Sequence, residues 1–330
     1  MKILVYSVRP DELSILAEWI KAHPDIQVDQ TTDLFDETTV DQAAGYDGVV
    51  LFQQQPFPDA AINKLNEMGV KNLSLRNVGV DNINLDLVKE NGMKLTNVPV
   101  YSPNAIAEHA VFLMGRLLRR VPEYDKKIAR GDLRWAPEIG RELRNQTVGV
   151  IGTGHIGQVI INILKGYGAK VICYDIFKND KLEQEGLYVD NLDDLYAQAD
   201  IITVHVPEVK ENIHMINNDS IAKMKDGVIL INVSRGGLVD TDDLIGNLNS
   251  KKIGAAGLDV YEGEVGVFNE DWEGKEIPDA RLRDLLSRDN VIVTPHIAFY
   301  TNTAVHNMVN VSLDSNVQLI KGETPDTLVK

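Results

Sequence analysis

Residues 147–157, with the sequence TVGVIGTGHIG, decide the fold because they join an apolar strand pattern to the start of an amphipathic helix. In such a turn Gly152 permits the tight bend, Gly154 lets backbone amides approach a pyrophosphate, and Gly157 lets helix and strand pack closely. A phosphate would then lie at the helix N-terminus, where free N–H groups and the helix dipole favour anions. The stretch is typical of a dinucleotide-binding fold.

An acidic residue follows the next strand along the chain. The apolar segment KVICY (170–174) leads directly into Asp175, 23 residues after Gly152. A carboxylate at a spacing of about 20 residues is expected to hydrogen-bond the adenosine ribose of the dinucleotide. Because a carboxylate there repels a 2′-phosphate, the sequence predicts NAD rather than NADP as the cofactor.

Apolar strand patterns alternate with helical segments along the chain, which predicts an α/β protein with doubly wound parallel sheets. Six strands are expected in the middle of the chain, at 147–151, 170–174, 201–206, 227–233, 254–260 and 290–294. Before them we expect strands at 2–7, 48–52, 72–76 and 93–98 with helices at 11–22 and 59–68, and after them a helix at 303–320. The organisation predicts a nucleotide-binding domain at 101–300, inserted into a second domain formed by 1–100 and 301–330.

Composition and charge exclude several classes of protein. A chain of 330 residues with 44% hydrophobic and 25% charged residues is ordinary for a globular protein of about two domains. Its net charge of −16 argues against nucleic-acid and anionic-membrane partners. No segment approaches the roughly 18 apolar residues that a membrane span needs, and the N-terminal stretch resembles a strand and turn rather than a signal peptide. The single cysteine, Cys173, lies in an apolar strand pattern, so we expect a buried thiol and a cytoplasmic protein.

Two segments stand out from this alternation. Residues 104–120 form a helical pattern that is apolar nearly all round, with Glu108 and His109 as exceptions, and such a helix must be covered on several sides. We expect it to lie between domains or against another subunit. Residues 263–280 form a long acidic loop, and loops of this length tend to be functional.

Arg235, Glu264 and His296 stand just beyond three successive strands of the central series. In an open parallel sheet, ligands bind outside the carboxyl ends of the strands. The set suits reduction of a 2-keto acid, because an arginine grips a carboxylate bidentately and a histidine can protonate the carbonyl oxygen. A glutamate can stabilise the imidazolium. Taken singly, each residue has a structural alternative, either an Arg–Glu ion pair or a core histidine. The other histidines show no metal-ligand spacing, so no metal is expected.

Several long motifs resemble the D-2-hydroxyacid dehydrogenase family, and more narrowly its branch of D-lactate dehydrogenases from lactic acid bacteria. The motifs are SLRNVGVDNI (74–83), NVPVYSPNAIAEHA (97–110), GTGHIG (152–157), YDIF (174–177), HVP (205–207), NVSRGGLVDT (232–241), DVYEGEVGVFNEDWEGKE (259–276) and VTPHIAFYT (293–301). The resemblance implies an NAD-binding Rossmann domain inserted into a split, flavodoxin-like catalytic domain. It further implies a homodimer formed through the NAD domain and interconversion of pyruvate and D-lactate.

The resemblance also implies roles for individual residues. Arg235 would bind the keto acid, His296 would be the acid/base, and Glu264 its partner, as the catalytic set. The cofactor site would comprise the three glycines with His155, Ile156, Asp175, Val206, Pro207, Asn212, Val233, Ser234 and Asp259. The substrate carboxylate would be held by the backbone of Val78 and Gly79 and by the Tyr101 side chain. The pocket for the C3 substituent would be shaped by Phe52 and Phe299.

Three alternatives follow from the same resemblance. Formate dehydrogenases carry glutamine at the position of Glu264, and phosphoglycerate dehydrogenases often add a domain for which this chain has little room. Dehydrogenases of branched 2-keto acids have a smaller aliphatic residue at the position of Phe52, so the aromatic ring favours pyruvate, although it would also suit phenylpyruvate. An NAD(H)-sensing binding protein of the same fold is the alternative from a different class.

Overall fold

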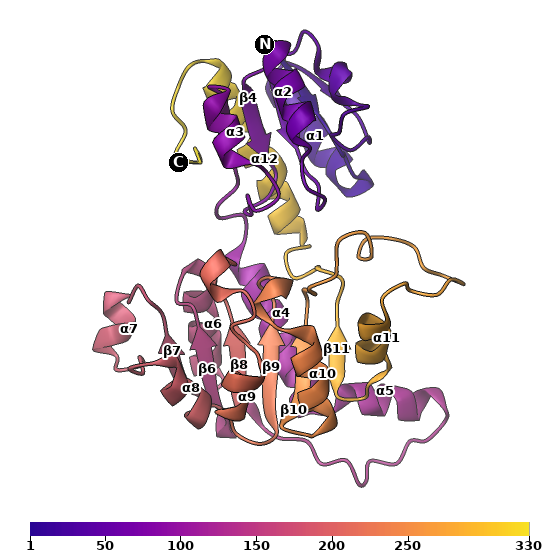
Figure 1. Ribbon diagram of the computed structural model, residues 1–330, viewed down its shortest axis with the longest axis vertical. Coiled ribbons are helices and arrows are strands. Elements are labelled where there is room, and N and C mark those ends of the chain that lie inside the picture. Colours follow the sequence, from indigo (N-terminus) through magenta and orange to yellow (C-terminus); the bar gives the residue numbers. More distant parts are fainter. Residues whose placement is uncertain (330) are drawn as a thin grey trace. The chain divides into compact units, whose positions relative to one another are not determined.

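The computed structural model describes residues 1–329, and the chain divides into two compact units. Unit 1 comprises Met1–Ser102 and Tyr300–Lys330, and unit 2 comprises Pro103–Phe299. Each unit is built on its own parallel sheet, with helices on both faces (Figure 1). The α/β class with two doubly wound sheets is therefore confirmed.

Unit 1 contains a five-stranded parallel sheet in the order β2-β1-β3-β4-β5. The strands are β1 (Lys2–Val5), β2 (Gln27–Gln30), β3 (Gly48–Leu51), β4 (Asn72–Leu75) and β5 (Lys94–Thr96). The helices are α1 (Leu13–Ala22), α2 (Asp59–Glu67), α3 (Leu85–Glu90) and α12 (Asn302–Ile320), and the 3-10 helices are η1 (Pro10–Glu12) and η2 (Val40–Ala43). This strand order is the flavodoxin-like one. The polar strand β2 has no apolar alternation, and sequence analysis missed it.

Side chains of successive residues in β1 enter opposite cores, as the pleat of a strand requires. Ile3 and Val5 pack with α1 and α12, whereas Leu4 packs with α2 and α3 on the other face. The C-terminal helix α12 completes the domain, because buried Asn316 donates to the carbonyls of Val49 and Asn72. The last 30 residues thus fold with the first hundred.

Unit 2 contains a six-stranded parallel sheet in the order β11-β10-β9-β8-β6-β7. The strands are β6 (Thr147–Ile151), β7 (Lys170–Tyr174), β8 (Ile201–Val204), β9 (Val228–Asn232), β10 (Ile253–Leu258) and β11 (Val291–Val293). A single parallel bridge from Cys173 to Tyr188 adds a further edge position beside β7. When the strands of this domain are numbered by their order in the chain, with the bridge position as the third, their order across the sheet is 3-2-1-4-5-6-7. The first six of these positions follow the Rossmann order.

The sheet of unit 2 is covered on both faces (Figure 1). One face packs against α8 (Leu192–Gln198), α9 (Asn218–Ala222), α10 (Thr241–Asn249) and α11 (Ala280–Ser287). The other is covered by α4 (Pro103–Leu118) and α6 (His155–Gly166), which pack on each other, with α5 (Val121–Ala129) beside α4. The short helix α7 (Asp180–Gln184) precedes the edge bridge. Sequence analysis did not predict α5, whose residues are mostly polar.

Helix α4 packs closely on the sheet, because a Cβ on Gly257 of β10 would lie 3.1 Å from Leu113. Its apolar surface is therefore largely buried inside unit 2, although Phe112 remains 64% exposed. Several strands end one or two residues earlier than expected, as β8 does at Val204 rather than residue 206. The residues beyond them leave the sheet and carry the candidate site.

Candidate active site

The three glycines of the loop between β6 and α6 have different surroundings. Gly152 has φ 97°, and a Cβ there would lie 2.5 Å from the carbonyl oxygen of His205. A Cβ on Gly157 would lie 2.0 Å from the carbonyl oxygen of Gly152, so this glycine lets helix and strand meet. Gly154 has nothing within 4 Å of its Cβ position. Two glycines therefore serve packing, and the third leaves open space at the N-terminus of a 12-residue helix.

Asp175, just beyond β7, is hydrogen-bonded to the glycine loop. One carboxylate oxygen accepts from the Thr153 backbone N–H at 2.6 Å and from its hydroxyl at 3.1 Å, and the other accepts from the Phe177 N–H. The Tyr188 hydroxyl is 2.7 Å from the Thr153 hydroxyl and ties the edge bridge to the same loop. A fixed carboxylate beside an open glycine turn fits the adenosine ribose of NAD and disfavours a 2′-phosphate.

The other expected cofactor residues lie at the same carboxyl edge of the sheet. The Ser234 hydroxyl donates to the Val206 carbonyl, which joins the segments after β8 and β9. The Asn212 amide donates to the Pro207 carbonyl within the first of them. The start of α6 supplies His155 and Ile156, and the ends of β9 and β10 supply Val233 and Asp259. Their common feature is that each follows a strand, or opens the helix, at the carboxyl edge of one parallel sheet.

Glu264 and His296 form a direct pair at 2.6 Å between Oε1 and Nδ1. The second carboxylate oxygen of Glu264 accepts from the Tyr261 N–H at 2.8 Å, so both oxygens are held. His296 has a left-handed backbone, φ 55°, and its N–H donates to the carbonyls of Asp259 and Thr294. With Nδ1 bound to the carboxylate, Nε2 is the ring nitrogen available for proton exchange with a substrate.

Arg235 follows the end of β9, in the loop next to the one that carries Glu264. It precedes the 3-10 helix η5 (Gly236–Leu238), is half-buried, and donates from Nη1 to the Ser234 carbonyl at 2.9 Å. A Cβ on Gly236 would lie 2.2 Å from the carbonyl carbon of Tyr261, three residues before Glu264. The arginine, the glutamate and the histidine therefore occupy adjacent loops of one unit.

A buried network behind His296 was missed by sequence analysis. Fully buried Asp259 accepts hydrogen bonds from the Thr294 hydroxyl and from the N–H groups of Ile297 and Ala298. His109, from α4, lies 3.4 Å from the same carboxylate. Burial works against ionisation, but these hydrogen bonds outweigh it and hold the pKa of Asp259 below its usual value. The signal in the sequence was the polar His109 in an otherwise apolar helix.

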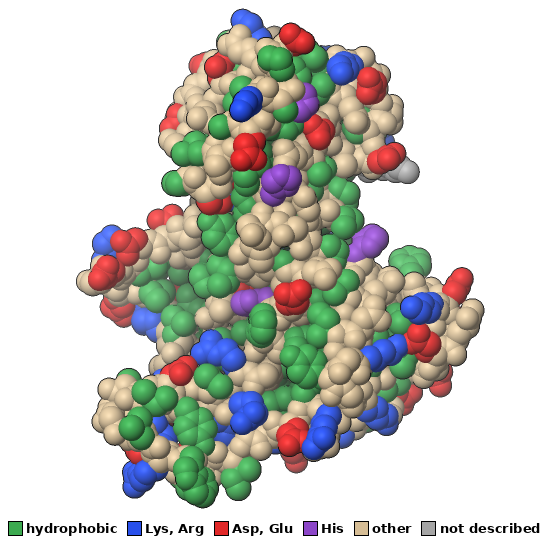
Figure 2. All heavy atoms as spheres, turned by 180° about the vertical axis from the view of Figure 1, so that it is seen from behind, with side chains coloured by type: hydrophobic (Ala, Val, Ile, Leu, Met, Phe, Trp, Pro, Cys, Tyr) green, Lys and Arg blue, Asp and Glu red, His purple; other side chains and the backbone are tan. Residues whose placement is uncertain are grey.

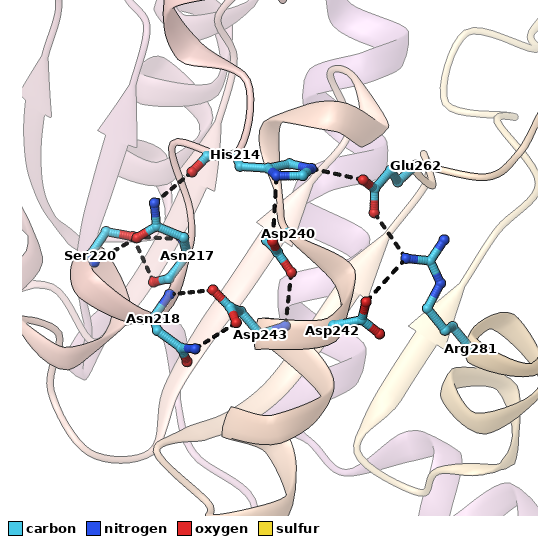
Figure 3. A network of polar contacts seen from close by, with 9 residues as sticks. All are labelled: His214, Asn217, Asn218, Ser220, Asp240, Asp242, Asp243, Glu262 and Arg281. Carbon is cyan, nitrogen blue, oxygen red and sulfur yellow. Dashed lines mark hydrogen bonds and ion pairs between the residues drawn. The ribbon is translucent and has the colours of Figure 1, made fainter.

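A second polar network braces the turn that carries Glu264 (Figure 3). The His214 ring lies between two carboxylates, 2.7 Å from Glu262 and 3.4 Å from Asp240 at the start of α10. Glu262 is also paired with Arg281 at 3.4 Å. The backbone N–H of His214 donates to the Gly237 carbonyl. The network therefore links the segment after η4 (Lys210–Asn212) to the loops of Arg235 and Glu264.

The expected substrate residues fall in both units. Phe52, Val78, Gly79 and Tyr101 belong to unit 1, just beyond β3, β4 and β5. The carbonyls of Val78 and Gly79 accept from the Asn97 and Asn77 side-chain amides. Phe299 is the last residue of unit 2, and its ring lies edge-on to the His296 ring at 6.3 Å between centroids.

Two further groups are chemically inert. Cys173 is buried, and burial raises the pKa of its thiol to about 12. His205 is buried against the Thr203 hydroxyl, and burial lowers its pKa to about 3, so the ring is neutral. Among residues 1–329, no cluster of three or more His, Cys, Asp or Glu side chains is arranged to hold a metal ion. Within the same residues, no helix combines the length and apolar character needed to cross a bilayer.

The two glycine environments predict opposite effects of adding one methyl group. We expect Gly154→Ala to keep the wild-type melting temperature but to weaken NADH binding at least about tenfold, because the methyl group fills the space that the phosphates need. Gly157→Ala should lower the melting temperature instead, because its Cβ meets backbone. Thermal unfolding and fluorescence titration with NADH measure both effects. Unchanged NADH affinity in Gly154→Ala would contradict this assignment of the loop.

Comparison with known proteins agrees with this geometry. Residues 111–298 match the family model described as the NAD-binding domain of D-isomer specific 2-hydroxyacid dehydrogenases. A D-lactate dehydrogenase of Lactobacillus delbrueckii subsp. bulgaricus is 58% identical over 329 residues, which cover 100% of this chain and 99% of the relative.

Solved structures show the same similarity over the whole chain. A D-2-hydroxyisocaproate dehydrogenase superimposes with a TM-score of 0.91 at 42% identity, covering 100% of this chain and 99% of the other. The NAD complex of a D-isomer specific 2-hydroxyacid dehydrogenase from Lactobacillus delbrueckii ssp. bulgaricus gives 0.87 at 36% identity, covering 100% of both chains. The open glycine turn, the anchored Asp175 and these matches identify NAD as the cofactor. The chain belongs to the D-isomer specific 2-hydroxyacid dehydrogenase family.

Proposed function

We propose that this protein is an NAD-dependent D-lactate dehydrogenase, which interconverts pyruvate and D-lactate. The observation that carries the proposal is the Glu264–His296 pair at 2.6 Å, in loops next to the one that carries Arg235. The relative at 58% identity, a D-lactate dehydrogenase, supports pyruvate as the substrate. The D configuration of the product rests on membership of this family.

In the proposed mechanism, Arg235 binds the keto acid through its guanidinium group and polarises the carbonyl. Bound NADH supplies the hydride that C2 of pyruvate receives. The Nε2 proton of His296 passes to the carbonyl oxygen, so the new alcohol gains one hydride and one proton. The Glu264 carboxylate stabilises the imidazolium before the transfer and holds the ring in orientation. In lactate oxidation His296 takes the proton back.

The family resemblance also assigns substrate contacts to residues of unit 1 in this proposal. The substrate carboxylate is assigned to backbone groups of Val78 and Gly79 and to the Tyr101 side chain, and the C3 substituent to Phe52 and Phe299. An aromatic ring at position 52 shortens the space for that substituent and favours the methyl group of pyruvate. Branched or aromatic 2-keto acids are the alternative substrates, since a D-2-hydroxyisocaproate dehydrogenase shares 42% identity.

A keto-acid panel tests the proposal directly. With NADH we expect pyruvate to give the highest kcat/KM, D-lactate to be the product, and His296→Gln to lower kcat by about 10²–10⁴ without weakening NADH binding. The measurement is NADH oxidation at 340 nm with chiral analysis of the product. Tight NADH binding without turnover of any keto acid would favour the sensor alternative, and a preference for 2-ketoisocaproate or phenylpyruvate would replace pyruvate as the substrate.

The pair with Glu264 predicts a loss of activity when its charge is removed. Glu264→Gln keeps the size of the side chain but loses the negative charge that orients the His296 ring and favours the imidazolium, so kcat for pyruvate reduction should fall about tenfold or more while NADH binding is kept. Glu270→Gln, at an exposed position of the same loop, is the matched control and should keep the wild-type kcat. Wild-type kcat in Glu264→Gln would exclude this role for Glu264.

The proposal includes a cytoplasmic homodimer formed through the NAD domain. Helix α4 and the segment before β6 line a surface cavity of about 710 Å³, which includes exposed Phe112 and Tyr167. Figure 2 looks onto the side of unit 2 that α4 covers, with hydrophobic groups among basic ones. Leu133, Trp135 and Ile139 are each at least 80% exposed in the loop after α5. Exposed apolar groups in this number indicate an interface.

Replacement of one aromatic side chain tests the dimer. We expect wild type to sediment at twice the chain mass of 36.7 kDa and Phe112→Glu to dissociate at micromolar concentration, because a buried unpaired charge is costly. Leu286→Glu, at an exposed position on α11, is the control and should stay dimeric. Wild type sedimenting as a single chain would exclude the dimer. Equal association of Phe112→Glu and wild type would place the interface elsewhere.

A further inference from the structure

Unit 1 contains a buried ion cluster at the carboxyl edge of its sheet, which the mechanism above does not use. Glu12, in η1, is fully buried and lies 3.3 Å from Arg9 and 3.1 Å from Arg76. The Arg9 N–H also donates to its second oxygen at 2.9 Å. Two cations therefore share one buried carboxylate, and Asp11 supplies a further negative charge 3.3 Å from Arg9.

Arg76 is fixed more firmly than an ordinary arginine. Its side chain is 1% exposed, and Nη2 donates to the carbonyls of Tyr6 and Ser7 at 2.9 and 2.8 Å. Burial lowers its pKa to about 10 against the opposing attraction of Glu12, so the group stays charged at neutral pH. A buried cation held by two carbonyls and a carboxylate does not change its position easily.

Both guanidinium groups lie against the ring of Phe52. The Arg9 guanidinium carbon is 4.6 Å from the ring centroid, and that of Arg76 is 5.7 Å from it. Cations at such distances over an aromatic face are attracted by its quadrupole. The backbone beside the ring is also fixed, because the Gln53 carbonyl accepts from the Asn82 amide at 2.8 Å. Both the ring and its main chain are thus held in place.

The topology places this cluster beside the proposed substrate residues. Arg9, Phe52 and Arg76 follow β1, β3 and β4, which are adjacent strands of the sheet. Val78 and Gly79, expected to bind the substrate carboxylate, come two and three residues after Arg76. The ion cluster therefore lies at the same sheet edge as these residues, and nothing in the reaction itself requires charges there.

We infer that Arg9 is a specificity-determining residue, which acts by holding the Phe52 ring as a rigid wall at the end of the substrate pocket. The inference rests on the proposed function. Arg9 positions the ring and does not touch the substrate. Glu12, itself paired with Arg76, holds the Arg9 guanidinium in position. Without the Arg9 contact, the Phe52 ring would rotate and admit a longer C3 substituent. Selectivity for pyruvate would then depend on the ion cluster as well as on the size of Phe52.

The test compares kcat/KM for pyruvate and 2-ketoisocaproate in wild type, Arg9→Met and Arg9→Lys. We expect Arg9→Met to raise the ratio of 2-ketoisocaproate to pyruvate about tenfold, a typical effect of altered pocket size. The change should lie mainly in KM. Arg9→Lys should give a smaller rise, because lysine keeps the charge but lacks the planar group. Arg9→Lys also keeps the inference testable if Arg9→Met does not fold, which thermal melting would reveal. Lys223→Met, at an exposed ion pair in unit 2, is the control and should keep the wild-type ratio.

A double-mutant cycle with Phe52→Leu separates the inference from a general effect on stability. Phe52→Leu alone should favour 2-ketoisocaproate, and adding Arg9→Met should then change the ratio no further, because the ring through which Arg9 acts is gone. A full effect of Arg9→Met in the Phe52→Leu background, or an unchanged ratio in Arg9→Met alone, overturns the inference. Wild type that reduces neither keto acid overturns the proposed function instead, so the two failures are distinguishable.

Discussion

The geometry of the site depends on one buried carboxylate, that of Asp259. It accepts hydrogen bonds from the Thr294 hydroxyl and from the N–H groups of Ile297 and Ala298. Its own backbone carbonyl accepts from the His296 N–H. These bonds stabilise the left-handed backbone of His296, which a histidine adopts only at a cost. An unpaired carboxylate in this place would cost about 3–5 kcal/mol, so site geometry and domain stability are linked.

The two units use the same parallel-sheet design for different tasks. In both, connections deliver loops to the carboxyl edge, so residues distant in sequence gather there. In unit 2 the edge begins with an open glycine turn at a helix N-terminus, which suits an anion. In unit 1 the same edge carries a buried ion cluster and an aromatic ring. One architecture thus supplies a cofactor site in one unit and, in the proposed function, a substrate surface in the other.

Charge is used locally in a protein that is strongly acidic overall. The net charge of −16 would repel a keto acid, and the proposed function assigns its binding to half-buried Arg235, just after β9. Buried ion groups elsewhere, such as Glu12 with Arg76, are costly to remove from water and rarely add stability. Their presence beside Phe52 is better explained by the ring position that they fix than by a contribution to the free energy of folding.

The sequence by itself determined the order of strands and helices, the glycine turn and Asp175, and it pointed to Arg235, Glu264 and His296 at strand ends. These features are local, because periodicity and spacing report strands, turns and the edge to which a residue belongs. It did not reveal polar β2 or α5, whose residues lack the apolar pattern. Only the tertiary structure brought His109 to Asp259, and Arg9 and Arg76 to Phe52. Such contacts join residues up to 150 positions apart, and the packing of whole elements, rather than any local pattern, decides which side chains meet.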